Sequence, residues 1–265
     1  MTGYPQYLYC YFPIESGISF LDTLKFRLSS VSDFNDPFES LFETEYPYFF
    51  LSFNEQSTID IIEDRIAIMN QRKWPNVAAI RNKSIGLVNL IKNLKIGCFS
   101  ETPDNILMWG HYARKFTGIV VKFRVSLADW GNDLKKVEYN NDRISITSFN
   151  IDTYGALEEE RALITRKSIN WEYEREWRYI RNTDDCPKDS KGYYKKVNKT
   201  AVKEVILGCR ICPNDLEKIK DVISKNFGPG LPISIVLPSQ SNYSLEIKDL
   251  SSVEFALKWN KKRKP

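Results

Sequence analysis

The 265-residue sequence predicts an α+β fold, in which one domain holds a central mixed β-sheet flanked by helices. Three observations lead to this fold class. A strand, a helix and a second strand follow one another in the last third of the chain. Two amphipathic helical segments occupy the first half, and alternating or β-branched runs lie around them. Hydrophobic residues make up 42% of the chain and charged residues 27%, which is sufficient for a packed core beneath a charged surface.

The first half of the chain predicts a strand followed by two helices. Residues 24–28 alternate apolar and basic side chains like a half-buried strand, and a turn follows over 33–37. The segments 56–73 and 76–94 each carry an apolar stripe with helical spacing. The stripe residues are Ile59, Ile62, Ile66 and Met69 in the first segment, and Ile80, Leu87, Ile91 and Leu94 in the second.

The middle of the chain predicts one further strand and one further helix. Residues 118–123 are rich in β-branched side chains, as in a buried strand. Residues 152–167 have an acidic first half and a basic end, and this order of charges suits the helix macrodipole.

The last third predicts a β-α-β unit. A buried strand over 202–208 precedes a helix that begins near Pro213 and ends before Gly228, and a second strand follows over 233–237. No glycine-rich phosphate loop joins the first strand to the helix, so the unit lacks a nucleotide-binding fingerprint. Strands over 243–248 and 253–257 are expected to close the sheet.

Length and charge favour a single domain over residues 1–257 with a basic tail over 258–265. Much of the net charge of +4 lies in this tail, and a basic terminus is usually a solvated end. The five cysteines and the absence of an apolar run of membrane length predict a cytoplasmic protein with no membrane partner. Cys209 and Cys212 have CxxC spacing but no second ligand pair, so we expect structural thiols and no metal site.

The run from Trp171 to Ile180 is the first candidate site. In an extended strand, Glu172, Glu174 and Glu176 share one face, and like charges at alternate positions repel unless cations or a ligand stabilise them. If the first half is helical, Glu174 and Arg178 form an i,i+4 pair instead. One interpretation is a surface lattice of salt bridges. The other is a carboxylate aimed into a cleft, provided by a strand that begins at Glu176 with Glu174 just before it.

His111, the chain's single histidine, marks a second candidate site. A lone histidine is more often a hydrogen-bonded packing residue than a catalyst, but Trp109 and Tyr112 beside it suit the stacking of a planar ring such as adenine or nicotinamide. Ser100 and Glu101 follow a predicted strand nearby. No Ser-His-Asp arrangement is defined, because the chain has no nucleophile-elbow motif.

The third candidate site is the run Phe34-Asn-Asp-Pro-Phe-Glu39, preceded by Arg27. Asn-Asp-Pro is a turn in its own right, since the two polar side chains can bond local amides and proline fixes the next dihedral angle. The aromatic residues that bracket the turn, with Glu39 beside them, also suit a lip over a pocket.

These motifs together resemble a large bacterial family of unknown function, DUF2971. The resemblance rests on FNDPFE (34–39), CFSE (98–101), LMWGHYA (107–113) with Gly118, the pattern K-x3-W-x-YE-x-EWR (167–178) and the strand 205–208. It spans about residues 7–247. The family usually opens with a Tyr-Lys-Tyr-like strand, whereas this chain has Tyr9-Cys10-Tyr11 and so lacks the basic residue.

A second resemblance, at the level of fold, is to ADP-ribosyltransferases. These enzymes commonly present Arg or His on an early strand, Ser or Tyr on a middle strand and a catalytic Glu, often as Glu-x-Glu, on a late strand. Arg27 (or the Tyr9–Tyr11 strand), Ser100 and Glu174-Arg-Glu176 occur in that order. The resemblance implies an ADP-ribosyltransferase-like fold, with NAD as substrate. The carboxylate would hold the nicotinamide ribose, an arginine the pyrophosphate, and Trp109 or Tyr112 a ring.

The leading hypothesis is therefore an NAD-using ADP-ribosyltransferase-like or NAD-cleaving enzyme, which would suit a toxin or phage-defence effector. A small nucleotide is the expected ligand, no metal is expected, and a protein or nucleic-acid target is left open. Candidate catalytic residues are Glu176, Glu174 and His111, and candidate binding residues are Arg27, Asn35, Glu39, Ser100, Glu101, Trp109, Tyr112 and Arg178.

Two alternatives belong to other classes. A nuclease or nucleic-acid-acting protein would bind Mg²⁺ through Glu39, Glu101, Glu174 and Glu176, and its basic tail would follow phosphates. A non-catalytic module would bind a small molecule or a partner in an aromatic cleft and turn nothing over.

Overall fold

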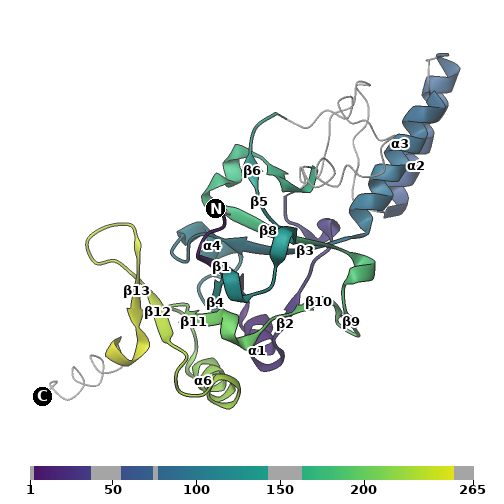
Figure 1. The fold of residues 1–265 in the computed structure, drawn as a ribbon. Helices are drawn as coiled ribbons and strands as arrows, with labels where there is room; N and C mark the ends of the chain where they lie inside the picture. Colours follow the sequence, from purple (N-terminus) through teal and green to yellow (C-terminus); the bar gives the residue numbers. More distant parts are fainter. Residues whose placement is uncertain (1–2, 37–54, 74–76, 143–162, 254–265) are drawn as a thin grey trace, which may run out of the picture.

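The computed structural model describes residues 3–36, 55–73, 77–142 and 163–253. Within these ranges, eight strands form one mixed sheet in the order β13-β12-β11-β4-β1-β3-β8-β5. β11 and β12 run parallel, and the other neighbouring pairs are antiparallel (Figure 1). The strands are β1 (Tyr7–Phe12), β3 (Leu94–Ser100), β4 (Ile119–Arg124), β5 (Leu134–Lys136), β8 (Glu176–Asn182), β11 (Val202–Leu207), β12 (Ile233–Pro238) and β13 (Leu245–Asp249). The α+β fold with a large mixed central sheet is therefore as the sequence predicts.

In the described part of the chain, two smaller sheets and several α-helices lie around the central sheet. The small sheets are β2 (Lys25–Arg27), β10 (Gly192–Lys196) and β9 (Lys188–Asp189) in one, and β6 (Glu138–Tyr139) with β7 (Arg166–Lys167) in the other. The labelled α-helices of the described residues are α1 (Ile14–Thr23), α2 (Glu55–Gln71), α3 (Val77–Lys92), α4 (Ile106–His111) and α6 (Pro213–Phe227). Short 3-10 helices are η1 (Val31–Asp33), η2 (Val125–Leu127), η3 (Gly131–Asp133), η5 (Ile169–Glu174), η6 (Thr183–Asp185) and η7 (Lys199–Ala201). None of these helices is long and apolar enough to cross a lipid bilayer.

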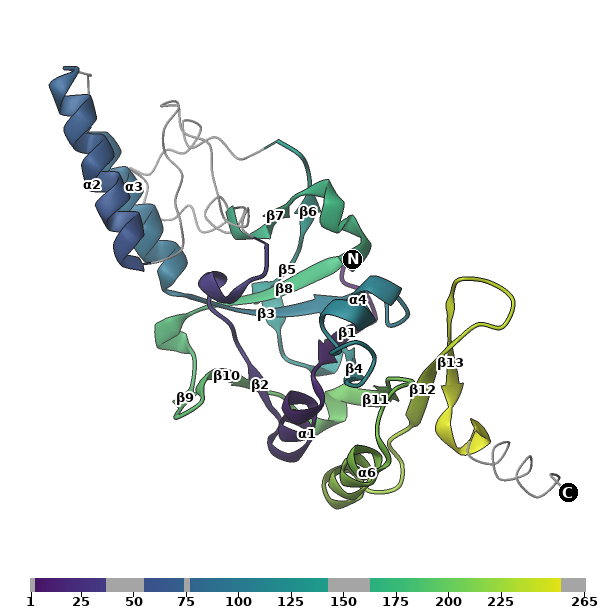
Figure 2. The same cartoon turned by 180° about the vertical axis from the view of Figure 1, so that it is seen from behind.

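The central sheet has a different core on each face. On one face, α1 and α6 cover a cluster in which several aromatic rings meet, and the rings of Phe26 and Phe99 stack with centroids 4.8 Å apart. On the other face, α4 packs Trp109 against β1 and β4. Further along that face, Ile96 of β3 and Ile180 of β8 belong to a third cluster together with side chains of α2 and α3. Figure 2 shows these two helices beyond the end of β3. The candidate site lies on this second face.

β1 and β3 diverge where the candidate site is formed. They share a single register pair, Tyr9 with Ser100, although β1 continues to Phe12 and β3 begins at Leu94. Further along β3, where β1 no longer pairs with it, Ser29 forms an antiparallel bridge with Ile96. The central sheet is therefore forked between β1 and β3, and space opens inside the fork.

Most predicted elements are confirmed, and several boundaries are corrected. Leu94 begins β3 instead of ending a helix, and β13 begins at Leu245. The predicted helix over 152–167 ends early: residues 163–165 are helical, but Arg166 and Lys167 form β7, parallel to β6; residues 152–162 lie outside the described residues.

The predicted last strand is also corrected. Residues 250–253 are helical, and the Asp249 carboxylate before them accepts hydrogen bonds from the Ser251 hydroxyl at 2.5 Å and the Ser252 amide at 3.1 Å. These bonds cap the turn and favour it over a strand. Residues 254–257 lie outside the described residues.

Gly208 is required by a close backbone approach at the end of β11. A Cβ atom there would lie 2.1 Å from the carbonyl oxygen of Phe116, which also accepts the Arg210 amide at 3.0 Å. We expect Gly208→Ala to lower the free energy of unfolding by about 1–3 kcal/mol, because backbone must shift to admit the methyl group. Urea denaturation followed by circular dichroism measures this. Gly230→Ala is the control, since a Cβ there meets nothing within 4 Å, and equal stability losses in both variants would contradict the argument.

Candidate functional site

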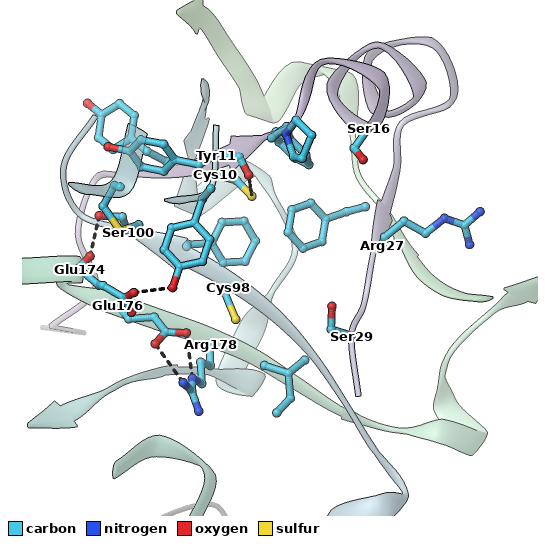
Figure 3. Close-up of a pocket in the computed structure, with 18 of the residues that line it drawn as sticks. Cys10, Tyr11, Ser16, Arg27, Ser29, Cys98, Ser100, Glu174, Glu176 and Arg178 are labelled. Atoms are coloured by element: carbon cyan, nitrogen blue, oxygen red, sulfur yellow. Dashed lines mark hydrogen bonds and ion pairs between the residues drawn. The ribbon is translucent and has the colours of Figure 1, made fainter. Parts of the chain in front are cut away.

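A pocket of about 290 Å³ lies in the fork between β1 and β3. Its lining includes Tyr9 and Tyr11 from β1, and Cys98 and Ser100 from β3. Figure 3 shows Glu174, Glu176 and Arg178 gathered at one end of the pocket, and Arg27 and Ser16 at the other. One end of the pocket is therefore ionic, and the remainder is lined mainly by aromatic and small side chains.

The local sequence places the two glutamates at the ionic end. Ser168 precedes η5 and accepts a hydrogen bond from the Asn170 amide at 3.4 Å. Arg175 ends η5 with a φ of 46°, a left-handed conformation that costs a non-glycine residue about 1–2 kcal/mol. The carbonyl oxygen of Arg175 accepts the Glu101 amide at 3.1 Å. This turn releases the chain into β8 at Glu176, so Glu174 stands just before the strand.

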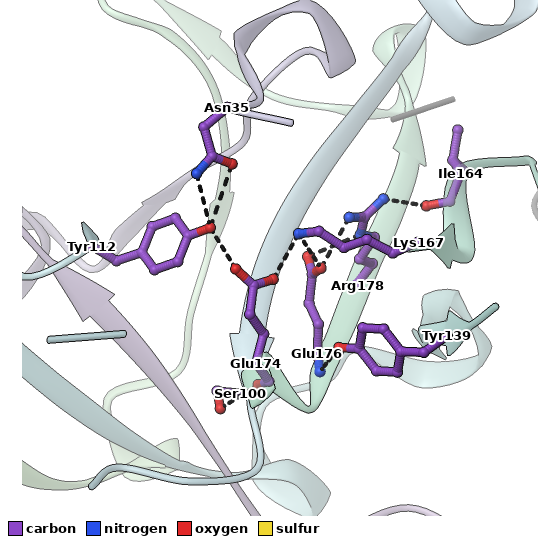
Figure 4. A network of polar contacts seen from close by, with 9 residues as sticks. All are labelled: Asn35, Ser100, Tyr112, Tyr139, Ile164, Lys167, Glu174, Glu176 and Arg178. Atoms are coloured by element: carbon purple, nitrogen blue, oxygen red, sulfur yellow. Dashed lines mark hydrogen bonds and ion pairs between the residues drawn. The ribbon is translucent and has the colours of Figure 1, made fainter. Parts of the chain in front are cut away.

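Glu176 is enclosed by cations. Its Oε1 accepts from Arg178 Nε at 2.9 Å, and its Oε2 accepts from Arg178 Nη2 at 2.9 Å, which makes a bidentate pair. Lys167 Nζ lies 3.3 Å from the same Oε2, and the backbone amide of Glu176 donates to the Tyr139 hydroxyl at 2.8 Å. Arg178 Nη1 also donates to the carbonyl oxygen of Ile164 (Figure 4).

Glu174 lies on the other side of the Lys167 amine from Glu176 (Figure 4). Its Oε2 accepts from Lys167 Nζ at 2.6 Å, and its Oε1 accepts from the Tyr112 hydroxyl at 2.6 Å. Asn35 in turn donates to that hydroxyl at 3.2 Å. The Ser100 hydroxyl donates to the carbonyl oxygen of Glu174 at 2.7 Å, which fixes the backbone at this position.

The four charged residues at the ionic end are buried and balanced. Lys167, Glu174, Glu176 and Arg178 are each between 1% and 5% exposed, and the two carboxylates face two cations. Burial of charge is costly without such pairing. The cluster formed by these four residues is called the ionic cluster below.

The two carboxylates of the ionic cluster differ in acidity. Burial raises the pKa of Glu176, but the charges of Arg178 and Lys167 outweigh burial and lower the pKa to about 2. Burial raises the pKa of Glu174, Lys167 opposes it, and the charge of Glu176 adds to it, so the pKa of Glu174 is raised above its ordinary value. Burial and the charge of Glu174 also raise the pKa of Tyr112, which keeps its hydroxyl a donor.

Seven of the predicted site residues line this one pocket. Glu174, Glu176 and Arg178 come from η5 and β8, and Ser100 ends β3. Tyr112 follows α4, and Asn35 and Arg27 come from the chain after α1. Arg27 is held at 2.8 Å from Asp189 and donates to the carbonyl oxygen of Gly192, so its guanidinium is engaged at the end far from the ionic cluster.

The structure does not bring three other predicted residues into the pocket. His111 is exposed and touches the edge of the Tyr112 ring. Trp109 is fully buried, stacks on Phe116 and donates to the carbonyl oxygen of Pro103, so its faces are packed. Glu101 accepts from Trp177 Nε1 and pairs with Lys136 and Arg175 outside the pocket lining. Glu39 lies outside the described residues.

The predicted helical pair of Glu174 with Arg178 is wrong. Residues 169–174 are helical but the helix ends at Arg175, so Arg178 projects from β8 on the same face as Glu176 and pairs with it instead. The surface salt-bridge lattice is also wrong for this pair, because both side chains are buried.

Sequence reasoning missed several residues of the pocket and its surroundings as site residues. Lys167 is the first residue of the K-x3-W-x-YE-x-EWR pattern, but it was not proposed as a site residue. It forms ion pairs with both glutamates because β7 places it beside them. Tyr9 and Cys98 stood in runs that the sequence analysis used, the Tyr9–Tyr11 strand and CFSE, but neither was named as a site residue. Tyr139 carried no comparable signal, since it reaches the site through the pairing of β6 with β7.

The described residues show no metal-binding arrangement. No group of three or more His, Cys, Asp or Glu side chains among them is placed to hold an ion. Of the four glutamates considered as Mg²⁺ ligands, Glu174 and Glu176 are tied to cations, and Glu101 lies elsewhere.

The comparisons with known proteins give one result. Neither the curated proteins nor the solved structures contain a match to this chain. Residues 108–179, from α4 to β8, match the model of the family described as protein of unknown function (DUF2971). This is the family that the sequence resembles, and the match covers that part of the chain.

Proposed function

We propose that this protein is an NAD-consuming enzyme, an ADP-ribosyltransferase or an NAD glycohydrolase. The observation that carries the proposal is the joint placement of Arg27, Ser100 and the Glu174–Glu176 pair around one pocket. Ser100 and the two glutamates stand far apart in the sequence and meet at the fork between β1 and β3, and Arg27 lies at the other end of the same pocket. A concave site with convergent polar groups and shifted pKa values is where a ligand is expected.

Cleavage of the bond between nicotinamide and ribose requires a carboxylate beside the nicotinamide ribose. In the hydrolytic reaction, the bond between ribose C1′ and the nicotinamide nitrogen breaks, and its electron pair leaves with nicotinamide. The oxygen of water bonds to C1′, and the proton lost by that water passes to solvent. A carboxylate that accepts a hydrogen bond from a ribose hydroxyl stabilises the positive charge that develops on the sugar. In the transferase reaction, a nucleophile on a target takes the place of water.

The size and lining of the pocket suit part of a dinucleotide. A volume of about 290 Å³ is at the lower end for small-molecule sites, so it would enclose the nicotinamide ribose and leave the rest of NAD outside. The rings of Tyr9 and Tyr112 line the pocket and would contact the planar base. If the ion pair between Arg27 and Asp189 broke, the Arg27 guanidinium would donate hydrogen bonds to a pyrophosphate oxygen.

An enzyme of this class depletes NAD, so its biological role would be that of a toxin or phage-defence effector in the cytoplasm. The same pocket could instead serve a non-catalytic binding module. Turnover separates the two, because a binding module is stabilised by its ligand and releases no product.

A thermal-shift titration of the purified protein with NAD, ADP-ribose and Mg²⁺ tests the proposal. A ligand that binds the native state raises the melting temperature by mass action, so a millimolar nucleotide reveals even a weak site. We expect NAD and ADP-ribose to raise it and Mg²⁺ alone to leave it unchanged. An unchanged melting temperature with both nucleotides would contradict the proposal. An increase with Mg²⁺ alone would favour the alternative of a metal-dependent nuclease.

A further inference from the structure

The two glutamates of the ionic cluster do not offer the same surface to a ligand. Both oxygens of Glu176 are bound by Arg178 at 2.9 Å, and Lys167 adds a third contact at 3.3 Å. An ionised carboxylate has about four acceptor positions, so three charged donors leave little capacity for a ligand hydroxyl. Removing those donors would leave charges buried and unpaired.

The carboxylate of Glu174 has acceptor positions left for a ligand, and one of its oxygens adjoins the pocket lining. Among the described residues, its carboxylate accepts from two donors, Lys167 on one oxygen and Tyr112 on the other, each at 2.6 Å. About two acceptor positions therefore remain. Tyr112 and Asn35 belong to the pocket lining, and Figure 4 shows them on the Oε1 side of Glu174, away from Lys167. The Oε1 side of Glu174 therefore adjoins residues that line the pocket.

The backbone holds Glu174 in this place. Its carbonyl oxygen accepts from Ser100, whose hydroxyl is fully buried and also accepts from the Thr102 amide at 3.1 Å. Both roles of the Ser100 hydroxyl are thus used within the protein, which makes Ser100 a positioning residue for Glu174. Catalysis requires the reacting side chains to be held in one position, and these hydrogen bonds hold the backbone of Glu174 in that way.

We propose that Glu174 is the catalytic carboxylate that contacts the ribose, and that Glu176 is the fixed counter-charge that orients Lys167 and Arg178. This assignment rests on the proposed function, because the ribose is that of NAD. It separates two residues that the Glu-x-Glu pattern alone treats as equivalent. The Tyr112 hydroxyl shares Glu174 with the ligand and keeps its carboxylate turned toward the pocket.

Three matched variants test the assignment: Glu174→Gln, Glu176→Gln and, as control, Glu172→Gln, which changes an exposed glutamate of the same run. Nicotinamide release from NAD is measured for each, below its melting temperature. We expect Glu174→Gln to lower kcat by about 10²–10⁴-fold with KM little changed, since the carboxylate acts mainly in the transition state. Glu176→Gln should keep kcat within about tenfold but lose about 5–10 °C of melting temperature. Glu172→Gln should match the wild type in both.

Glu174→Asp is a second variant, which keeps the negative charge but shortens the side chain by one methylene group. It should fold like the wild type and lose kcat, because the carboxylate no longer reaches the sugar. Full kcat in Glu174→Gln, together with a folded but inactive Glu176→Gln, would overturn the assignment while leaving the proposed function intact. A wild-type protein that releases no nicotinamide would overturn the proposed function, and the assignment with it.

Discussion

Replacing Arg178 by methionine is expected to lower the free energy of unfolding by about 3–5 kcal/mol, the cost of leaving a buried carboxylate without its main partner. Arg178 is 1% exposed and makes both hydrogen bonds of the bidentate pair with Glu176. Without it, Lys167 would be the remaining cation of the four-residue ionic cluster, and the cluster itself would carry a net negative charge. Urea denaturation at pH 7 measures the loss.

Arg181→Met is the matched control for this prediction. Arg181 projects from the same strand, and its side chain is 33% exposed and paired with Asp133 and Asp185. Such partly exposed pairs contribute about 0–1 kcal/mol. In addition, Arg178→Met combined with Glu176→Gln should recover part of the stability, because the orphaned charge is gone. Equal losses in Arg178→Met and Arg181→Met would contradict the balanced-cluster account.

Lys167→Met is expected to destabilise the protein strongly at pH 8, by about 3–5 kcal/mol, and much less at pH 5. The variant leaves two buried carboxylates with one guanidinium. Glu174, whose pKa is already raised by burial and by Glu176, should then take up a proton. A carboxyl whose pKa is raised in the folded state stabilises the protein below its unfolded pKa, and this contribution is lost as pH rises through the folded pKa. Acidification from pH 8 to pH 5 should therefore favour the variant relative to the wild type.

Urea midpoints at the two pH values check this prediction. Lys136→Met is the control, because Lys136 pairs with Glu101 through a side chain that is 58% exposed. Lys167→Met combined with Glu174→Gln should be more stable than Lys167→Met at pH 8, since one negative charge is removed from the ionic cluster. A stability loss in Lys167→Met that does not change with pH would show that Glu174 does not take up the proton.

The elements with strong periodicity or composition were predictable from the sequence. The strand at 118–123 and the β-α-β unit around α6 appear where β-branching, Pro213 and Gly228 predict them. The short helices were not. α1 spans ten residues and α4 six, too few for a periodic stripe to stand out, although Asn105 caps α4 by accepting from the amides of Leu107 and Met108.

Part of the pocket's lining was predictable from the sequence, but its geometry was not. The spacing of Glu174 and Glu176 before and at a strand start was read correctly, and Ser100 at the end of β3 was also identified. What spacing could not supply was β7, two residues long, which brings Lys167 between the glutamates. The packing of Trp109 was equally hidden, because a tryptophan beside a histidine looks the same in sequence whether its ring is buried or open.

Nicotinamide release from NAD by the purified wild-type protein is the decisive measurement for the proposed function. We expect time-dependent release that rises to saturation with NAD concentration and falls by about 10²–10⁴-fold in Glu174→Gln. Absence of release, together with absence of any melting-temperature shift by NAD or ADP-ribose, would contradict it.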